Sequence, residues 1–254
     1  MNDGTIGKQM RMAKQRADVL LVERGLAESR EKARALLLAG QVRLGDRVID
    51  KPGTLLPQDA ELRVLARTPY VSRGGVKLAH ALDVFRVDVA DAVAVDVGAS
   101  TGGFTDCLLQ RGARKVYALD VGRGQIDYRL RTDQRVVVIE GVNARYPLAL
   151  PEQVDVATVD VSFISLTLVL PNVLSAVKPG GLVVALVKPQ FEAGRGQVQR
   201  GGLVKDPAIH AEVLGRIILW IVEHGARLRG LTSSPIPGGD GNREFFVLVE
   251  NKMD

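Results

Sequence analysis

The chain has 254 residues, of which 46% are hydrophobic, 25% charged and 4% aromatic, with a single cysteine, Cys107. This composition suits a globular α/β core, and the lone cysteine excludes an internal disulfide framework, which favours a reducing compartment. Residues 1–80 carry 15 Lys and Arg against 9 Asp and Glu, whereas residues 81–254 carry 19 against 20. A basic module joined to a near-neutral one suggests a polyanion-binding part, although a solvated positive face without a partner fits the charge equally well.

The first 15 residues, MNDGTIGKQMRMAKQ, are polar and carry no secretory signal, so we expect a disordered lead-in. The most apolar window, residues 163–177, is shorter than the roughly 20 residues that span a bilayer, and Pro171 and Asn172 interrupt it. We therefore expect a cytoplasmic protein with no membrane association. No feature of the sequence requires an obligate protein partner.

Residues 16–66 predict a small α+β domain. A helical pattern runs from Arg16 to Leu26, and Ser29 is a good N-cap for a second helix over residues 30–39. The segment QVRLGDRVID (41–50) alternates as a β-hairpin, and AELRVLA (60–66) predicts a further strand. This fold would gather five basic side chains on one surface: Arg30, Lys32, Arg34, Arg43 and Lys51. We expect residues 67–75, RTPYVSRGG, to be the linker to a second domain, residues 76–254.

From residue 91 onward, apolar β-branched runs alternate with helical segments. The runs are AVAVDVG (92–98), KVYALDVG (115–122), RVVVIEGVN (135–143), VDVATVDVSF (154–163) and GLVVALVKPQF (181–191). Such runs predict a parallel sheet covered on both faces. A helix beginning at Asp206-Pro207 and two last strands, ARLRGLTSSPI (226–236) and NREFFVLVEN (242–251), complete the pattern. The final pair fits the seven-stranded Rossmann-like sheet of class I S-adenosylmethionine (SAM) methyltransferases and not a flavodoxin-like sheet.

The segment DVGASTGGFTD (96–106) predicts a nucleotide site, because a strand, a turn of small residues and a helix let a ligand approach the backbone. Gly98 and Gly103 fit the first and third positions of a dinucleotide fingerprint, but Ser100 occupies the middle position, which disfavours a diphosphate. Asp120, about 22 residues after Gly98, could accept hydrogen bonds from ribose hydroxyls, and Asn143 could contact an adenine edge. Taken singly, Asp120 is as easily a helix N-cap and Asn143 a turn residue.

Four charged residues are expected where a doubly wound sheet binds its ligand, namely Lys77, Asp160, Lys188 and Glu244. A lone lysine at the end of an apolar strand is costly to bury, so Lys188 needs a partner, and Asp160 is the natural one. Such a set could orient or deprotonate a ribose hydroxyl, and methyl transfer needs little more than an in-line oxygen nucleophile and exclusion of water. A structural ion-pair cluster is the alternative.

Several motifs resemble the TlyA family of ribosomal-RNA ribose 2′-O-methyltransferases, historically labelled haemolysin A. They are YVSRGGVKL, DVGASTGGFTD, ALDVGRGQIDYRLR, EGVNAR, DVSFISL, LVKPQFEAGRGQV and GNREFFV. The resemblance covers nearly everything from Arg16 onward. It implies an S-four-like RNA-binding domain, an FtsJ-like methyltransferase domain, and methyl transfer from SAM to a cytidine 2′-hydroxyl in ribosomal RNA within a ribosomal subunit.

The resemblance also implies roles for individual residues, without any metal. The catalytic tetrad falls on Lys77, Asp160, Lys188 and Glu244. The implied SAM-binding residues are Asp96, Gly98, Ala99, Ser100, Thr101, Gly102, Gly103, Phe104, Asp120, Val121, Asn143 and Asp160. RNA contacts fall on Arg16, Arg30 and Lys51, to which charge adds Lys32 and Arg43.

Two departures from the family pattern bear on these expectations. The linker has Thr68-Pro69-Tyr70-Val71 in place of Arg-x-Trp-Val, which leaves coupling through it open. The chain also ends soon after the last strand, which favours large-subunit RNA as the target. The rival hypotheses are a membrane-lytic protein, a non-catalytic RNA-binding factor that uses SAM for structure, and a dehydrogenase, which Ser100 disfavours.

Overall fold

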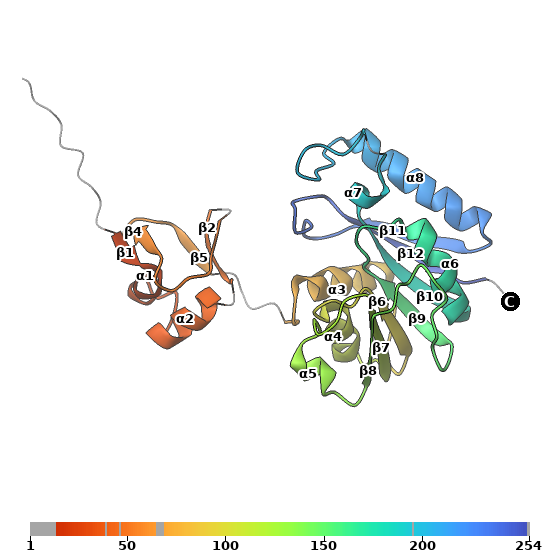
Figure 1. Cartoon of the computed structure of the whole chain (residues 1–254), viewed down its shortest axis with the longest axis horizontal. Coiled ribbons are helices and arrows are strands. Elements are labelled where there is room, and N and C mark those ends of the chain that lie inside the picture. The colour runs from red at the N-terminus through yellow and green to blue at the C-terminus, as the bar shows by residue number, and fades with distance from the viewer. Residues whose placement is uncertain (1–13, 39, 46, 65–68, 195, 253–254) are drawn as a thin grey trace, which may run out of the picture. The chain divides into compact units, whose positions relative to one another are not determined.

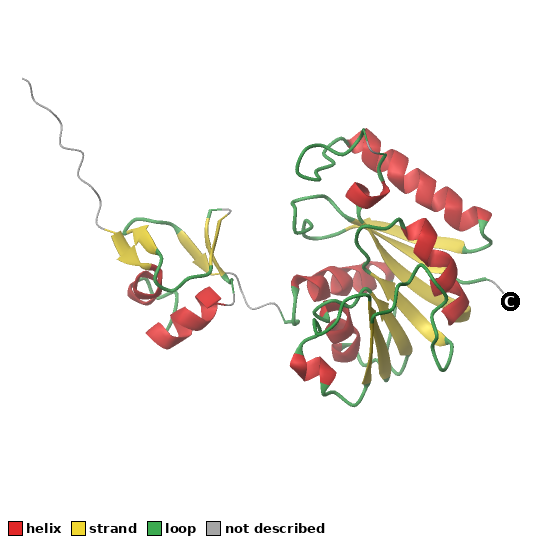
Figure 2. Cartoon of the chain, in the orientation of Figure 1, coloured by secondary structure: helices red, strands yellow, loops and turns green. Residues whose placement is uncertain are grey.

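The computed structural model describes residues 14–252 except positions 39, 46, 65–68 and 195 (Figures 1 and 2). The chain divides into two compact units, Met1–Arg67 and Thr68–Asp254. Of the predicted lead-in, residues 14 and 15 are not disordered, because they belong to a strand, β1, that pairs with residues 55–57. The rest of that segment lies outside the described residues.

The N-terminal unit places two helices, α1 (Ala17–Glu23) and α2 (Arg30–Leu38), against short antiparallel strands, as the sequence predicts. Strands β3 (Arg47–Ile49), β2 (Val42–Leu44) and β5 (Leu62–Val64) form one sheet, and β1 (Lys14–Arg16) pairs with β4 (Leu55–Pro57) in a second. The Ser29 hydroxyl accepts the backbone N–H of Lys32, which confirms the predicted N-cap. Gly40 closes the α2 segment at a φ of +64°, which favours glycine.

The C-terminal unit contains a seven-stranded sheet in the order β11-β12-β10-β9-β6-β7-β8. Its strands are β6 (Val93–Val97), β7 (Lys115–Asp120), β8 (Val136–Glu140), β9 (Val154–Val159), β10 (Val177–Val187), β11 (Arg227–Ser233) and β12 (Phe245–Glu250). The pairings from β8 through β10 are parallel, whereas β12 is antiparallel to both β10 and β11. The predicted parallel sheet with a final antiparallel pair is therefore confirmed.

Helices cover both faces of this sheet. They are α3 (Arg73–Phe85), α4 (Gly103–Gln110), α5 (Tyr128–Arg131), α6 (Leu166–Ala176), α7 (Pro189–Glu192) and α8 (Pro207–Glu223). One buried cluster joins the strands to α6 and α8, and another joins them to α3 and α4. Helix α3, which begins inside the segment expected to be a linker, was not evident from the sequence pattern.

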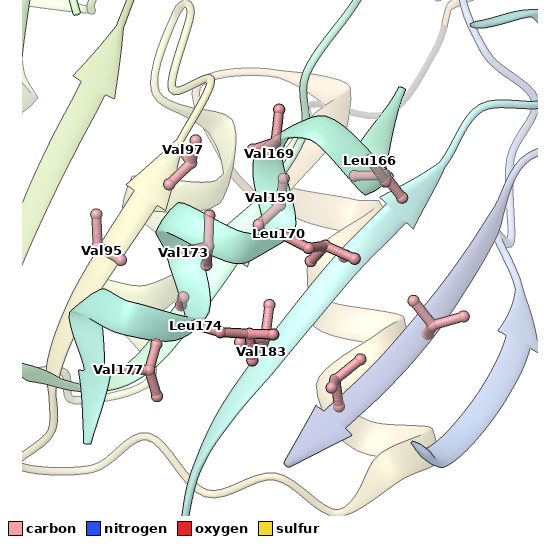
Figure 3. Packing of buried hydrophobic residues seen from close by; sticks show 14 of the residues in the cluster. Val95, Val97, Val159, Leu166, Val169, Leu170, Val173, Leu174, Val177 and Val183 are labelled. Carbon is pink, nitrogen blue, oxygen red and sulfur yellow. The ribbon is translucent and has the colours of Figure 1, made fainter. Parts of the chain in front are cut away.

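Helix α6 illustrates how the core is built (Figure 3). Leu166, Val169, Leu170, Val173 and Leu174 recur at helical spacing, are all at most 1% exposed, and lie over the apolar side chains of β6, β9 and β10. Full burial of such side chains stabilises a fold by about 1.5–3 kcal/mol each. This packing fixes the strand ends that carry the polar residues described next.

Candidate active site

Polar side chains gather at one edge of the sheet. The carboxyl ends of parallel strands meet at the same edge, so Gly98 after β6, Asp160 after β9 and Lys188 after β10 become neighbours. Because β12 is antiparallel, its first residue pairs with the last residue of β10, Phe245 opposite Val187. That register brings Glu244 to the same edge as Lys188.

The four predicted charged residues form two ion pairs at this edge. Lys77 Nζ lies 2.5 Å from Glu244 Oε2, and their side chains are only 9% and 3% exposed. Lys188 Nζ lies 2.5 Å from Asp160 Oδ1, with 13% and 23% exposure, which confirms the predicted partner of Lys188. The set is electrically balanced, as burial of charge requires. Of the four, Lys77 and Asp160 line the cavities described below, whereas Lys188 and Glu244 line neither.

Lys188 has a second contact that the sequence analysis missed. Its Nζ donates a hydrogen bond of 3.0 Å to the Ser162 hydroxyl, two residues beyond Asp160. The next residue, Phe163, adopts a φ of +63°, which is rare for a bulky side chain, and the residue is 90% exposed. The Phe163 and Phe191 ring centroids are 4.8 Å apart, so the segments after β9 and β10 contact each other at several points.

The glycine turn is shaped by close backbone packing. A Cβ on Gly98, whose φ is +86°, would lie 2.3 Å from the carbonyl oxygen of Asp160, and one on Gly103 would lie 2.2 Å from the Ser72 hydroxyl oxygen. The backbone N–H of Ser100 donates to Asp120 Oδ2 over 2.7 Å, which ties the turn to the end of β7. Only glycine fits at the first of these positions, since it needs both the positive φ and the missing side chain.

Two cavities meet at the turn. One of about 280 Å³ is lined by Ser72, Arg73, Gly74, Lys77, Gly98, Ala99, Ser100, Thr101, Gly103, Phe104 and Asp160. The other, of about 750 Å³, is lined by Asp120, Val121, Asn143, Arg145, Ser162, Phe163 and Phe191 among others. Gly98, Ser100 and Asp160 line both, so the two ion pairs lie beside one end of a larger groove.

Two of the residues expected to bind the cofactor lie on neither cavity wall, Asp96 and Gly102. Asp96 is fully buried and accepts hydrogen bonds from the Thr105 and Thr158 hydroxyls at 2.7 and 3.1 Å. Burial raises the pKa of Asp96 to about 7. Gly102 has a φ of +96° and packs against Leu130. In this structure both residues therefore stabilise the conformation of the turn and do not face the two cavities.

The N-terminal unit has its own charged cluster, centred on Asp18. Arg16 donates to both carboxylate oxygens of Asp18 at 2.9 and 3.0 Å, and Arg30 Nε donates at 3.2 Å. The Asp18 side chain is 1% exposed, whereas those of Arg16 and Arg30 are 46% and 60% exposed. Hydrogen bonds from Arg16 hold the pKa of Asp18 below its usual range. Asp18 was not predicted as a site residue, because an aspartate inside a helical pattern gives no functional signal.

The other predicted RNA contacts differ in their surroundings. The backbone N–H of Asp18 donates to Pro52 O and that of Thr54 to Lys51 O, so the turn holding Lys51 lies against the start of α1. Lys32 of α2 forms an exposed ion pair with Glu28, which lies two residues before that helix begins. Arg43 lies half-buried on β2, where it pairs in register with Val48 and Arg63.

Family models match both units of the chain. Residues 70–251 match the FtsJ-like methyltransferase family, and residues 15–62 match the S4 domain. YqxC of Bacillus subtilis, provisionally named an rRNA methyltransferase, is 51% identical over 94% of this chain and 86% of its own length. The 16S/23S rRNA (cytidine-2′-O)-methyltransferase TlyA of Mycobacterium tuberculosis is 44% identical over 94% of this chain and 91% of its own.

The chain belongs to the TlyA family of FtsJ-like methyltransferases. A solved Streptococcus thermophilus structure, provisionally named a hemolysin, is 46% identical with a TM-score of 0.74, covering 94% of this chain and 89% of that one. The haemolysin name in this family is a legacy label. Within the described residues, no helix has the length and apolar content needed to cross a bilayer.

Family and fold make this TlyA-family protein a SAM-dependent enzyme, and the observed residues fit that cofactor. Gly98 and Ser100 line both cavities, so a ligand can lie against the turn, and Asp120 stands at the end of β7, where a ribose would present its hydroxyls. Val121, 69% exposed on the cavity wall, offers an apolar surface for adenine. Nowhere in the described residues do three His, Cys, Asp or Glu side chains come together as metal ligands would.

Proposed function

We propose that this enzyme transfers a methyl group from SAM to the 2′-hydroxyl of a cytidine in ribosomal RNA, in the cytoplasm. The observation that carries the proposal is the presence of two ion pairs beside the glycine turn, the buried Lys77–Glu244 and the partly buried Lys188–Asp160. The M. tuberculosis relative, named for cytidine 2′-O-methylation, supports the choice of reaction and nucleotide. The S4 domain supports RNA as the substrate.

When bound, SAM supplies an electrophilic methyl group on a sulfonium. The protein's part is to hold a ribose hydroxyl in line with that methyl group and to keep water away. Lys188, held by Asp160 and Ser162, would donate a hydrogen bond to the hydroxyl oxygen and stabilise its developing negative charge, while the Asp160 carboxylate, which lines both cavities, accepts the hydroxyl proton. Lys77 and Glu244 form the second ion pair of the site, so their two charges add no net charge to it.

Phe163 is suited to hold the nucleobase. Its exposed ring lines the larger cavity three residues after Asp160, and the left-handed backbone there is a local strain that neighbouring contacts must maintain. A cytidine must be turned out of its stack to reach a buried site, and an aromatic face offers about 1–3 kcal/mol of stacking to an unpaired base.

The proposal is tested by methyl transfer from labelled SAM to small subunits, large subunits and intact ribosomes that lack the modification. Wild type should label a cytidine 2′-oxygen in one of these particles, and mapping the nucleotide would identify the substrate. Lys188→Ala should lose the label, whereas Lys178→Ala, which removes an exposed ion-paired lysine from β10, the strand that precedes Lys188, should retain it. Absence of label from every particle while SAM still binds would reject the ribosomal assignment.

A further inference from the structure

The segments that follow β9 and β10 are joined at four points around Lys188. Asp160 and Ser162 both contact Lys188 Nζ, the first by an ion pair and the second by a hydrogen bond. Phe163 contacts Phe191 three residues beyond Lys188. Glu192 accepts hydrogen bonds of 2.7 Å from the Ser165 hydroxyl and the Leu166 N–H at the start of α6.

The geometry at Lys188 makes its direction depend on Ser162. An ammonium group carries three N–H donors, and a single carboxylate contact leaves it free to rotate about that contact. A second acceptor at 3.0 Å removes this freedom and leaves one N–H for a substrate oxygen. Because a hydroxyl can accept and donate at once, Ser162 satisfies the ammonium without adding a charge to the balanced set.

The backbone next to Ser162 keeps its hydroxyl in place. The left-handed conformation at Phe163 is unfavourable for a bulky side chain, and the contact of its ring with Phe191 helps to maintain it. The Glu192 bridge then fixes the distance between the two segments, and burial raises the pKa of the Glu192 carboxyl in this bridge. The Ser162 side chain is therefore set by contacts that do not involve the substrate.

We propose that Ser162 is a positioning residue, which orients the Lys188 ammonium so that its remaining N–H points at the hydroxyl being methylated. The inference rests on the proposed role of Lys188 in methyl transfer. It concerns Ser162 alone, which lines the larger cavity and is exposed, so that small changes of its side chain can be accommodated.

The test compares Ser162→Ala, Ser162→Thr and Ser175→Ala in the full-length protein under single-turnover conditions. Ser162→Ala removes the acceptor and should lower the maximal rate about tenfold or more, the usual weight of a hydrogen bond to a charged group, with SAM and RNA affinities unchanged. Ser162→Thr keeps the hydroxyl and should recover the rate to within about threefold. Ser175, an exposed serine of α6 that bonds Asn172 O, serves as the control.

The outcomes separate this inference from the proposed function. A wild-type rate for Ser162→Ala, or an equal loss for Ser162→Ala and Ser162→Thr, overturns the positioning role. If Ser162→Ala lowers thermal stability and also weakens SAM and RNA binding, Ser162 has only a structural role, which also overturns the proposal. Full activity of Lys188→Ala would instead reject the mechanism on which the inference rests.

Discussion

The two units of the chain each hold a charged cluster, and the clusters differ in burial and balance. In the N-terminal unit, one buried carboxylate, Asp18, holds two arginines that remain about half exposed, so the surface keeps a net positive charge. In the C-terminal unit, two lysines and two carboxylates are paired, and all four are at most 23% exposed. Exposed cations can bind a polyanion such as RNA in water. Charged groups that are shielded from water interact more strongly with the reacting atoms, because the local dielectric is low.

The largest effect is expected from breaking the more buried pair. Glu244→Gln leaves the Lys77 ammonium buried without a counter-charge, which should cost about 3–5 kcal/mol of unfolding free energy and lower the methyl-transfer rate about 100-fold. Glu250→Gln, at the far end of the strand that begins next to Glu244, breaks a more exposed pair with Arg229 and should cost under about 1 kcal/mol. Denaturant unfolding and single-turnover assays measure both. Equal costs for the two variants would contradict the distinction between the pairs.

Asp96→Asn should change how stability depends on pH. The unfolded carboxyl ionises near its ordinary pKa of 3.8, whereas the folded one does so at about 7. Its stabilising contribution is therefore complete below pH 3.8 and is lost as the pH rises toward 7, by up to about 4 kcal/mol.

This loss should be absent in Asp96→Asn, so the difference in unfolding free energy between variant and wild type should grow in favour of the variant from pH 4 to pH 7. Denaturant unfolding at each pH measures it. Asp88→Asn, which alters an exposed turn carboxylate, is the control. If the unfolding free energies of Asp96→Asn and wild type changed in parallel with pH, the pKa of Asp96 would not be raised by folding.

Gly98→Ala tests the shape of the cofactor turn. The added Cβ would meet the Asp160 carbonyl oxygen at 2.3 Å in a backbone conformation that favours glycine. We expect a loss of about 2–3 kcal/mol in unfolding free energy and at least tenfold weaker SAM binding by calorimetry. Gly180→Ala is the matched control, because Gly180 also has a positive φ but no neighbouring atom within 4 Å of the added Cβ. An unchanged SAM affinity in Gly98→Ala would show that the turn is not part of the cofactor site.

The smallest effect concerns the exposed cluster. Asp18→Asn removes the charge that holds Arg16 and Arg30 together, so binding to ribosomal subunits should weaken roughly tenfold and the maximal methyl-transfer rate should stay the same. Asp83→Asn, which alters an exposed pair with Arg111, should leave the affinity unchanged. Circular dichroism of the full chain checks that the N-terminal unit remains folded. An unchanged affinity for Asp18→Asn would show that the arginines need no such support.

The sequence predicts the strands better than the details of the site. The β-branched runs and the rule that parallel strands end at one edge were enough to place Asp160 beside Lys188. Helix α3 was not predicted because Gly74 and Gly75 lower helix propensity. Glycine is needed at position 75 because a Cβ there would lie 2.2 Å from the Tyr70 ring, a contact that the sequence does not show.

The contacts around Lys188 could not be read from the sequence for a similar reason. The left-handed backbone at Phe163 and its ring contact with Phe191 join residues that are 28 positions apart, and no local pattern encodes them. The buried role of Asp96 was missed because a carboxylate at the start of a glycine turn looks the same whether it faces the ligand or the two threonine hydroxyls behind it.

The most direct test of separate binding and catalytic clusters is the single-turnover methylation rate as a function of subunit concentration, for wild type, Arg30→Ala and Lys188→Ala. Arg30→Ala should raise the concentration needed for half-maximal rate and leave the maximal rate unchanged. Lys188→Ala should lower the maximal rate and leave that concentration unchanged. If both variants change the same parameter, the two clusters do not have the separate roles described here.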